Sequence, residues 1–251
     1  MKKKILYLPL IFVSILILII DMSFTLKSVT VYKDRDHWEK TGKIIWEVQT
    51  EKKVVALTFD DGPSPTFTPQ VLEILKKYDA KGSFFVIGKQ AEKFPEIVIR
   101  TALQGHTIGN HMHNHQTIIK IAKEDLIKDL SQAHQLIFRL TGQVPQFFRP
   151  PDGYYDQEIV DAAEALNYKI ILWTWTQDTR DWSGIPADTI AQKIIKNITP
   201  GDIILFHDQG GDRSNTVKAL EIVLPALKEK GYRFITVEEM LKIKNASAAK
   251  N

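Results

Sequence analysis

The chain has 251 residues, of which 44% are hydrophobic, so it is long enough for one domain with a sizeable core or for a single α/β barrel. Its formal net charge is only +3, with acidic and basic residues mixed along the chain, and this balance gives no reason to expect a nucleic-acid partner. Because there is no cysteine, disulfides, a catalytic thiol and thiolate metal sites are excluded, and any metal must be held by imidazole and carboxylate groups.

The N-terminus has the features of a membrane anchor. Lys2, Lys3 and Lys4 precede an apolar run from Ile5 to Ile20, which is at the short end of the range of about 17–25 residues for a spanning helix. No small-residue cleavage pattern follows, which favours an uncleaved signal anchor over a cleaved signal. We therefore assign residues 1–24 to a single-pass anchor and, by the positive-inside rule, place the following domain outside the cell. Secretion after signal cleavage is the main alternative, and a buried helix of the domain is a weaker one.

Strands and helices alternate after a polar, weakly periodic stretch. We expect residues 25–50 to form a stalk and a short leader, residues 51–243 the domain, and residues 244–251 a disordered tail. Strands are expected at 54–59, 83–87, 146–148, 169–173, 202–206 and 233–237, and helices at 69–78, 123–140, 156–166, 187–195 and 216–230.

This alternation implies parallel strands, and about seven such units indicate a β/α barrel, complete or incomplete. A doubly wound open sheet is the alternative, although we find no glycine-rich phosphate loop to support it. In β/α barrels the reactive groups come from the carboxyl ends of the strands.

Adjacent carboxylates, Asp60 and Asp61, follow the first expected strand. Two such groups at the end of a buried strand repel each other and are costly to desolvate unless a metal or another cation lies beside them. A surface turn is the alternative, because Asp-Asp-Gly-Pro is also good turn chemistry.

Two histidines with metal-ligand spacing form a second cluster. His111 and His115 are four residues apart and would lie on one face of a helical turn, where two imidazoles can bind one ion. His113 and His106 are expected either to be exposed or to contact the metal-binding side chains without binding the metal themselves. A solvated histidine-rich loop is the alternative.

Three further polar clusters follow later strands. Arg149 could pair with a carboxylate of the first cluster, and His207 is a candidate acid or base with an unperturbed pKa near 6.5. Between them, Trp173 and Trp182 flank acidic residues that include Asp181, an arrangement that suits sugar rings. The alternatives are a proline-stiffened loop for Arg149, a hydrogen-bonded structural histidine, and tryptophans that fill the core.

With these clusters in order, the chain resembles the polysaccharide deacetylases of carbohydrate esterase family 4, also called the NodB-homology domain. The resemblance covers roughly residues 53–241. Its five motifs are matched by Thr58 to Pro63, by His111 with His115, by Arg149 to Pro151, by Asp178 to Trp182 and by Leu205 to Asp208.

The resemblance implies a distorted (β/α) barrel and a divalent metal held by Asp61, His111 and His115. The metal is usually zinc in this family, with cobalt and nickel as alternatives. A site with three protein ligands leaves positions open for water and the substrate carbonyl.

The resemblance also implies the roles of the other site residues. Asp60 would be the general base, oriented and charge-balanced by Arg149. His207 would be the general acid that protonates the leaving amine, tuned by Asp181.

Trp182 and Leu205 would line the slot for the acetyl methyl group, and the backbone N–H of Asp152 would bind the oxyanion. Two positions depart from the family pattern: Met112 replaces the usual Ser or Thr, and Asp152 replaces the usual Tyr. We expect these departures to lower the activity or change the substrate preference without abolishing turnover.

The expected function is therefore removal of N-acetyl groups from an extracellular polysaccharide that contains N-acetylglucosamine. Peptidoglycan is favoured because the domain is expected at the membrane, followed by chitin oligomers and acetyl xylan. A non-catalytic glycan-binding module is the first alternative, and a hydrolase of another small amide is the second. We expect a monomer that contacts its polysaccharide, the membrane through its anchor, and no nucleic acid.

Overall fold

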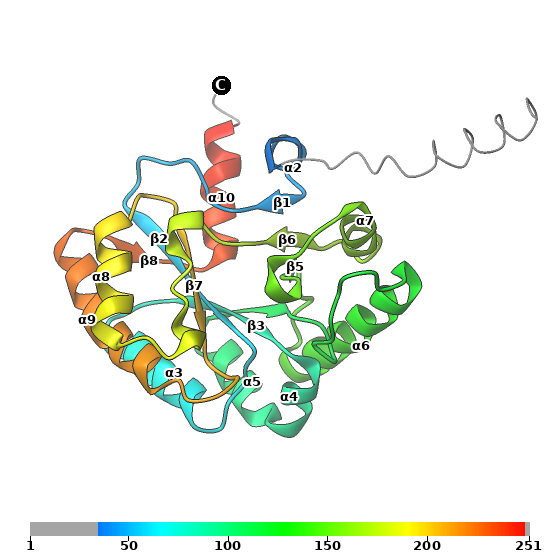
Figure 1. Ribbon diagram of the computed structural model, residues 1–251, viewed down its shortest axis with the longest axis horizontal. Helices are drawn as coiled ribbons and strands as arrows, with labels where there is room; N and C mark the ends of the chain where they lie inside the picture. Colours follow the sequence, from blue (N-terminus) through cyan, green and yellow to red (C-terminus); the bar gives the residue numbers. More distant parts are fainter. Residues whose placement is uncertain (1–34, 249–251) are drawn as a thin grey trace, which may run out of the picture. The chain divides into compact units, whose positions relative to one another are not determined.

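The structure is a computed structural model that describes residues 35–248 (Figure 1). The predicted anchor, residues 1–24, and the first part of the predicted stalk lie outside the described residues. Within residues 35–248, no helix combines the length and the apolar character needed to span a membrane.

A parallel sheet forms the centre of the domain. Its strands are β1 (Ile44–Ile45), β2 (Val54–Asp60), β3 (Gly82–Val86), β4 (Thr107–Asn110), β5 (Phe147–Phe148), β6 (Lys169–Ile171) and β7 (Ile203–His207), with β8 (Arg233–Phe234) paired to β2. The order is β1-β6-β5-β4-β3-β2-β7, and every pairing is parallel. Seven strands thus follow one path, as the alternation of the sequence predicts.

The two ends of this path are not joined by a continuous ladder of the described residues. They approach each other through isolated bridges, Glu47 with Asp202 and Asp178 with Leu205. The backbone N–H of Thr174 also donates to the carbonyl of Ile203 in β7, at 3.0 Å. The prediction of a distorted barrel of about seven strands is therefore confirmed in the form of an incomplete barrel.

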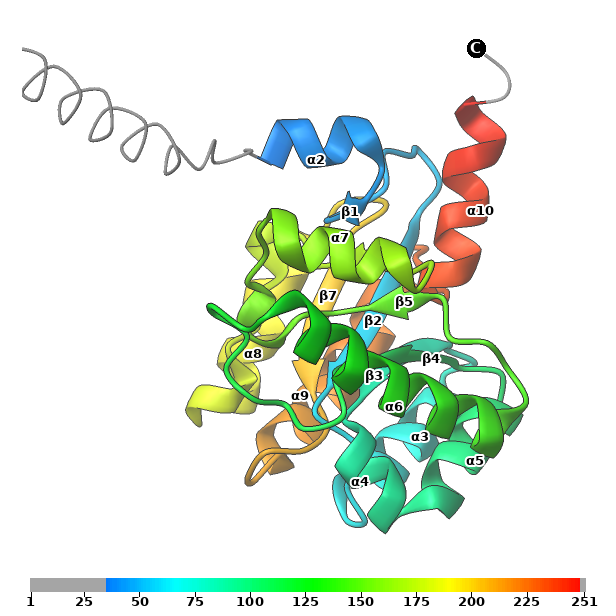
Figure 2. The same cartoon turned by 90° about the vertical axis from the view of Figure 1, so that its right-hand side faces the viewer.

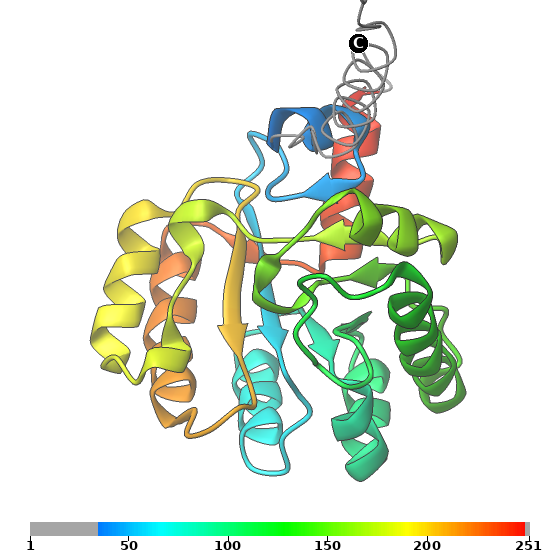
Figure 3. The same cartoon turned by 45° about the vertical axis from the view of Figure 1, so that its right-hand side comes forward.

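The helices surround the strands (Figures 1 and 3). They are α2 (Arg35–Thr41), α3 (Phe67–Lys77), α4 (Gly88–Lys93), α5 (Pro95–Leu103), α6 (Lys123–Thr141), α7 (Gln157–Ala165), α8 (Ala187–Asn197), α9 (Ser214–Glu229) and α10 (Val237–Ala248). Helix α10 lies at the amino end of β2 (Figure 2), where its Met240 packs with Val54. The carboxyl ends of the strands are on the opposite side.

Strand β2 shows how the sequence divides the two faces of the sheet. Val55, Leu57 and Phe59 pack in the cluster that contains the apolar faces of α3, α8 and α9. The alternate positions face the other way, so that Val54 belongs to the interior cluster and Asp60 reaches the pocket at the carboxyl end. Because side chains alternate along a strand, the apolar run of β2 delivers its terminal carboxylate to the barrel interior.

Three segments differ from the expectation. Residues 35–50 are not a stalk in the described part: β1 pairs with β6, and its Ile44 and Ile45 are buried. Helix α10 extends to Ala248, into the segment expected to be disordered. The strand expected at 233–237 ends at Phe234, because Thr236 caps α10 in a reciprocal pair of hydrogen bonds with Glu239.

Candidate active site

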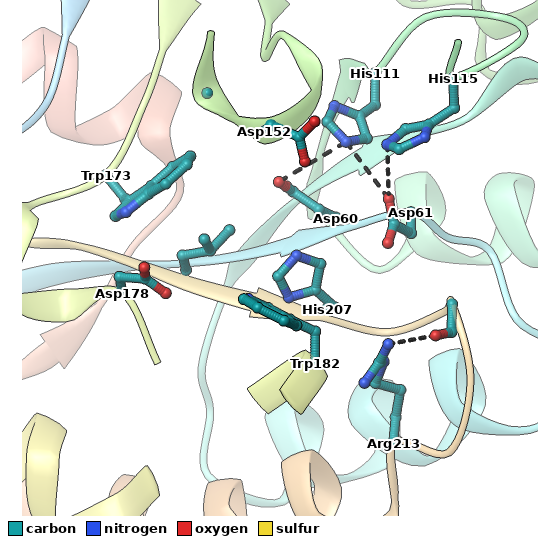
Figure 4. Close-up of a pocket in the computed structure, with 13 residues that line it drawn as sticks. Asp60, Asp61, His111, His115, Asp152, Trp173, Asp178, Trp182, His207 and Arg213 are labelled. Atoms are coloured by element: carbon teal, nitrogen blue, oxygen red, sulfur yellow. Dashed lines mark hydrogen bonds and ion pairs between the residues drawn. The ribbon is translucent and has the colours of Figure 1, made fainter. Parts of the chain in front are cut away.

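The pocket at the carboxyl end of the sheet collects most of the predicted site residues (Figure 4). It is lined by eight of them, namely Asp60, Asp61, His111, His115, Asp152, Trp182, Leu205 and His207. Two others lie behind this lining: Arg149, which is entirely buried, and Asp181, which is 2% exposed. The structure thus brings together residues from five separate segments of the chain.

Asp61, His111 and His115 converge on one point. One potential ligand atom from each lies within 4.8 Å of the others. The Oδ1 atom of Asp61 is 3.5 Å from Nε2 of His111 and 3.3 Å from Nε2 of His115. One carboxylate with two imidazoles at this spacing is a donor set for a divalent metal such as zinc.

The hydrogen bonding of His111 fits a metal ligand. Its Nδ1 lies 2.7 Å from the carbonyl oxygen of Arg149, which can only accept a hydrogen bond, so Nδ1 carries the proton. In the neutral imidazole, Nε2 then presents its lone pair to the Asp61 carboxylate. Two acceptors facing each other repel unless a cation lies between them, and a carbonyl that holds Nδ1 is a usual support for a metal-binding histidine.

The Asp61 carboxylate is suited to remain ionised. Burial raises its pKa, but with no cation between them the His111 and His115 rings, when protonated, donate hydrogen bonds to it that outweigh burial and hold the pKa well below its ordinary value. Asp61 also has a left-handed backbone, with φ at 73°. This turn directs two successive carboxylates, those of Asp60 and Asp61, into one pocket.

Asp60 is paired with a buried guanidinium. Nη1 of Arg149 donates to Oδ1 of Asp60 at 2.8 Å and to the hydroxyl of Thr58 at 2.9 Å. Its Nε and Nη2 donate to the carbonyls of Ile171 and Leu172. Burial lowers the pKa of Arg149, while the charge of Asp60 opposes that shift. The ion pair expected between Arg149 and the first acidic cluster is present, and it keeps Asp60 in a fixed orientation.

His207, at the end of β7, is paired with a buried carboxylate. Its Nδ1 lies 2.7 Å from Oδ1 of Asp181, and its backbone N–H donates to Oδ2 at 2.9 Å. The hydroxyl of Thr216 also donates to Oδ2, at 2.7 Å. Burial lowers the pKa of His207, but the hydrogen bond and charge of Asp181 outweigh it and raise the pKa to about 8. The ring can therefore carry a proton near neutral pH, and its Nε2 is not engaged by Asp181.

Two side chains form an apolar wall beside His207. Leu205 is 4% exposed, whereas Trp182 is 57% exposed and can meet a ligand from solvent. Opposite them, Asp152 has a left-handed backbone, with φ at 56°. Asp61 is the main cause of the raised pKa of His115, and the charge of Asp152, which lines the pocket, adds to it. The acidic group that departs from the family pattern therefore faces the site.

The histidine segment differs from the expected helical turn. His111 follows β4, which the sequence analysis did not identify, and residues 111–115 form an irregular loop. Met112 and His115 have φ values of 66° and 49°. His106 and His113 are both buried, not exposed. The two imidazoles meet because of this loop and not because of helical periodicity.

Arg213 and Gly210 are pocket residues that the sequence analysis missed. Arg213 is 4% exposed, and its Nε and Nη2 donate to the carbonyls of Gln209 and Gly210. Gly210 has φ at 90°, and a Cβ there would lie 3.0 Å from Oδ2 of Asp61. In the sequence, Gly210 and Gly211 after the His207 strand could have indicated this part of the pocket, because paired glycines mark a turn with unusual backbone angles.

Comparison with known proteins agrees with this geometry. Residues 47–171 match the family model described as polysaccharide deacetylase. A peptidoglycan-N-acetylglucosamine deacetylase of Bacillus cereus is 43% identical over 211 residues, which are 84% of this chain and 99% of that protein.

Solved structures show the same fold. The crystal structure of the Bc1960 peptidoglycan N-acetylglucosamine deacetylase is 39% identical, with a TM-score of 0.77 over 81% of this chain and 94% of that one. BA3943, a pseudoenzyme of the CE4 family from Bacillus anthracis, is 30% identical, with a TM-score of 0.74 over 80% of this chain and 69% of that one.

Proposed function

The chain belongs to the polysaccharide deacetylases of carbohydrate esterase family 4, and from this premise we propose that it hydrolyses the N-acetyl groups of N-acetylglucosamine residues in peptidoglycan. The products are acetate and a glycan with free amino groups.

One observation carries the proposal: a base and an acid flank the three converging metal ligands in a single pocket. Hydrolysis of an amide at neutral pH needs an activated water molecule and a proton for the departing nitrogen. Asp60, held by Arg149, ends β2, and His207, held by Asp181, ends the neighbouring strand β7 in register with it. A carboxylate paired with a guanidinium suits proton removal, and an imidazole paired with a carboxylate suits proton donation.

We propose zinc as the native metal, with cobalt and nickel as alternatives. Asp61, His111 and His115 would hold it, because two imidazoles and a carboxylate are a common set for a catalytic zinc with open positions. When bound, the cation would supply Lewis acidity, which lowers the pKa of water and polarises a carbonyl group.

The remaining chemistry belongs to the protein side chains. Asp60 takes a proton from the attacking water, and Arg149 keeps its carboxylate in place for that transfer. The N–H of Asp152 donates to the acetyl oxygen as negative charge develops there. Nε2 of His207 then gives a proton to the nitrogen, so that the C–N bond breaks with a neutral amine as leaving group.

The apolar wall of Leu205 and Trp182 would receive the acetyl methyl group. Leu205 is almost fully buried behind the pocket surface, while the broad face of Trp182 is open to a sugar ring. A small apolar slot beside the acid favours acetyl over longer acyl groups, because a longer chain would meet the buried Leu205 side chain.

The proposed location is the outer face of the cell membrane, with residues 1–24 as an uncleaved anchor. Three lysines before the apolar run support this orientation, and peptidoglycan lies on the same side. Fractionation tests it: we expect the full chain in the membrane pellet, and release of the domain in a shortened, soluble form would instead indicate signal cleavage.

A non-catalytic glycan-binding role is the second candidate. Its motivation is the pair of departures at Met112 and Asp152, together with the likeness to a pseudoenzyme. The base, the acid and all three ligand residues are present in this chain, which favours the enzyme.

Release of acetate from peptidoglycan and from N-acetylglucosamine oligomers, with and without a chelator, tests the proposal. We expect chelator-sensitive release, greater on peptidoglycan. Asp60→Asn should abolish turnover and leave metal bound, because Asp60 is not one of the three converging ligands. Absence of chelator-sensitive release from every substrate would reject the enzyme, and a fully active Asp60→Asn variant would reject Asp60 as the base.

A further inference from the structure

The loop that carries both metal-binding imidazoles has no regular secondary structure of its own. Residues 111–115 follow β4, and Met112 and His115 have left-handed φ values of 66° and 49°. A non-glycine residue in this region is strained, and surrounding contacts must hold it. The position of His111 relative to His115 therefore depends on whatever fixes the backbone between them.

Two buried side chains bind that backbone from one side. Oδ1 of Asn110 accepts the N–H of Met112 at 2.9 Å. Oδ1 of Asp129, on α6, accepts the N–H of His113 at 2.5 Å, and its Oδ2 accepts the backbone and side-chain N–H groups of Asn114 at 3.2 and 2.5 Å. Every backbone N–H from 112 to 114 is thus taken by one of two side chains.

The start of α4 binds the same loop from the other side. The N–H groups of Gly88 and Lys89 donate to the carbonyls of Met112 and His113 at 2.9 and 3.0 Å. A Cβ at Gly88 would lie 2.2 Å from Nδ1 of His113, so the helix end fits directly against the loop.

Both side chains are themselves anchored on the α6 side of the loop. Nδ2 of Asn110, which is fully buried, donates to the carbonyl of Leu130 and to the hydroxyl of Tyr168. Asp129 is 5% exposed, and among residues 35–248 no Lys, Arg or His lies within ion-pair distance of it. Its buried charge is therefore stabilised by the hydrogen bonds that it accepts from the N–H groups of the loop.

Met112 contributes packing in place of a hydrogen bond. Its side chain is fully buried and packs in the cluster that contains Leu126, Leu130 and Phe148. A Ser or Thr at this position, as in the family pattern, would offer a hydroxyl to the loop, and methionine offers none.

We propose that Asn110 and Asp129 are positioning residues for the metal centre, which hold the loop so that His111 and His115 both face Asp61 in the absence of a hydroxyl at position 112. The effect on turnover rests on the proposed function. The effect on metal affinity does not, because it concerns only the geometry of the imidazoles.

The test compares Asp129→Ala and Asp129→Asn with Asp125→Ala, which removes an exposed carboxylate from the same helix. We expect zinc affinity, measured by competition with a chelating dye, to fall about 10–100-fold in Asp129→Ala, as is usual when a group that orients a metal ligand is lost. Asp129→Asn keeps one oxygen acceptor and should lose less affinity. The control should bind zinc as the wild type does.

The visible spectrum of the cobalt-loaded protein separates positioning from simple stabilisation, because the spectrum reports coordination geometry. We expect it to change in both Asp129 variants and to stay unchanged in Asp125→Ala. Wild-type affinity and spectrum in folded Asp129 variants would overturn the proposal, even if their melting temperatures fell. Failure of both variants to fold, with the control folded, would also overturn it, since the role would then be structural. These outcomes are independent of acetate release, which tests the proposed function on the wild-type protein.

Discussion

The pairing of His207 with Asp181 determines the pKa of the proposed general acid. Asp181 raises the pKa of His207 to about 8 against the effect of burial. A general acid must be protonated, so we expect kcat/KM to fall as the pH rises through that value. Replacement of Asp181 by Asn removes the charge that favours the protonated ring of His207. The fall of kcat/KM at alkaline pH, the alkaline limb of its pH profile, should therefore begin at a lower pH.

The pH dependence of kcat/KM for Asp181→Asn and the wild type measures this shift. Asp178→Asn is the matched control, because Asp178 lines the same pocket and its carboxylate accepts from Arg180. An alkaline limb that keeps its position in Asp181→Asn would show that His207 is not the group that must hold the proton.

At the residue scale the sequence predicted which side chains meet but not how the backbone brings them together. Asp60, Asp61 and His207 were identified because each lies at the end of an apolar strand. The left-handed turns at Asp61 and Met112 were not predicted, since they depend on contacts with distant segments. Arg213 was missed because its hydrogen bonds to the loop before it have no periodic pattern.

At the scale of elements, the segment that includes α2 and β1 belongs to the fold. Ile44 and Ile45 are fully or almost fully buried and pair with β6, and Trp38 is 2% exposed. Burial of a large aliphatic side chain contributes about 1.5–3 kcal/mol to the free energy of unfolding. Deletion of this segment should therefore strongly destabilise the domain.

Two shortened chains test that role. The chain that lacks residues 1–34 keeps α2 and β1 and serves as the reference. Removal of residues 1–50 exposes the edge of β6 and takes away its buried partners, so we expect a much lower melting temperature or aggregation. Equal melting temperatures for the two shortened chains would show that β1 adds nothing to stability.

The sequence predicted long elements well and short ones poorly. The helix expected at 123–140 is α6, Lys123–Thr141, because nineteen residues carry a clear apolar stripe. Strand β1 has only two residues, too few for any periodicity, whereas the equally short β5 lies within the strand expected at 146–148. Strand β4 has only four residues and ends in the polar Asn110. The strand that leads to His111 therefore has no apolar run by which it could be predicted.

At the scale of the whole molecule, alternation of strands and helices was sufficient to predict a parallel β/α barrel. It could not predict that the barrel is incomplete, because closure depends on whether the ends of the sheet meet. Here no ladder pairs β7 with β1 in the described part of the chain, and isolated bridges and single backbone hydrogen bonds link the segments that flank them. The site lies at the carboxyl ends of the strands, where residues far apart in sequence converge.

Anomalous diffraction at the zinc edge, from crystals of the zinc-loaded protein, tests the central claim most directly. We expect one strong peak bonded to Asp61, His111 and His115, at about 2.0–2.2 Å from each ligand atom. The peak should disappear in crystals of His111→Ala grown under the same conditions. A map with no peak between these three side chains, or with zinc bound elsewhere while they stay apart, would contradict the account.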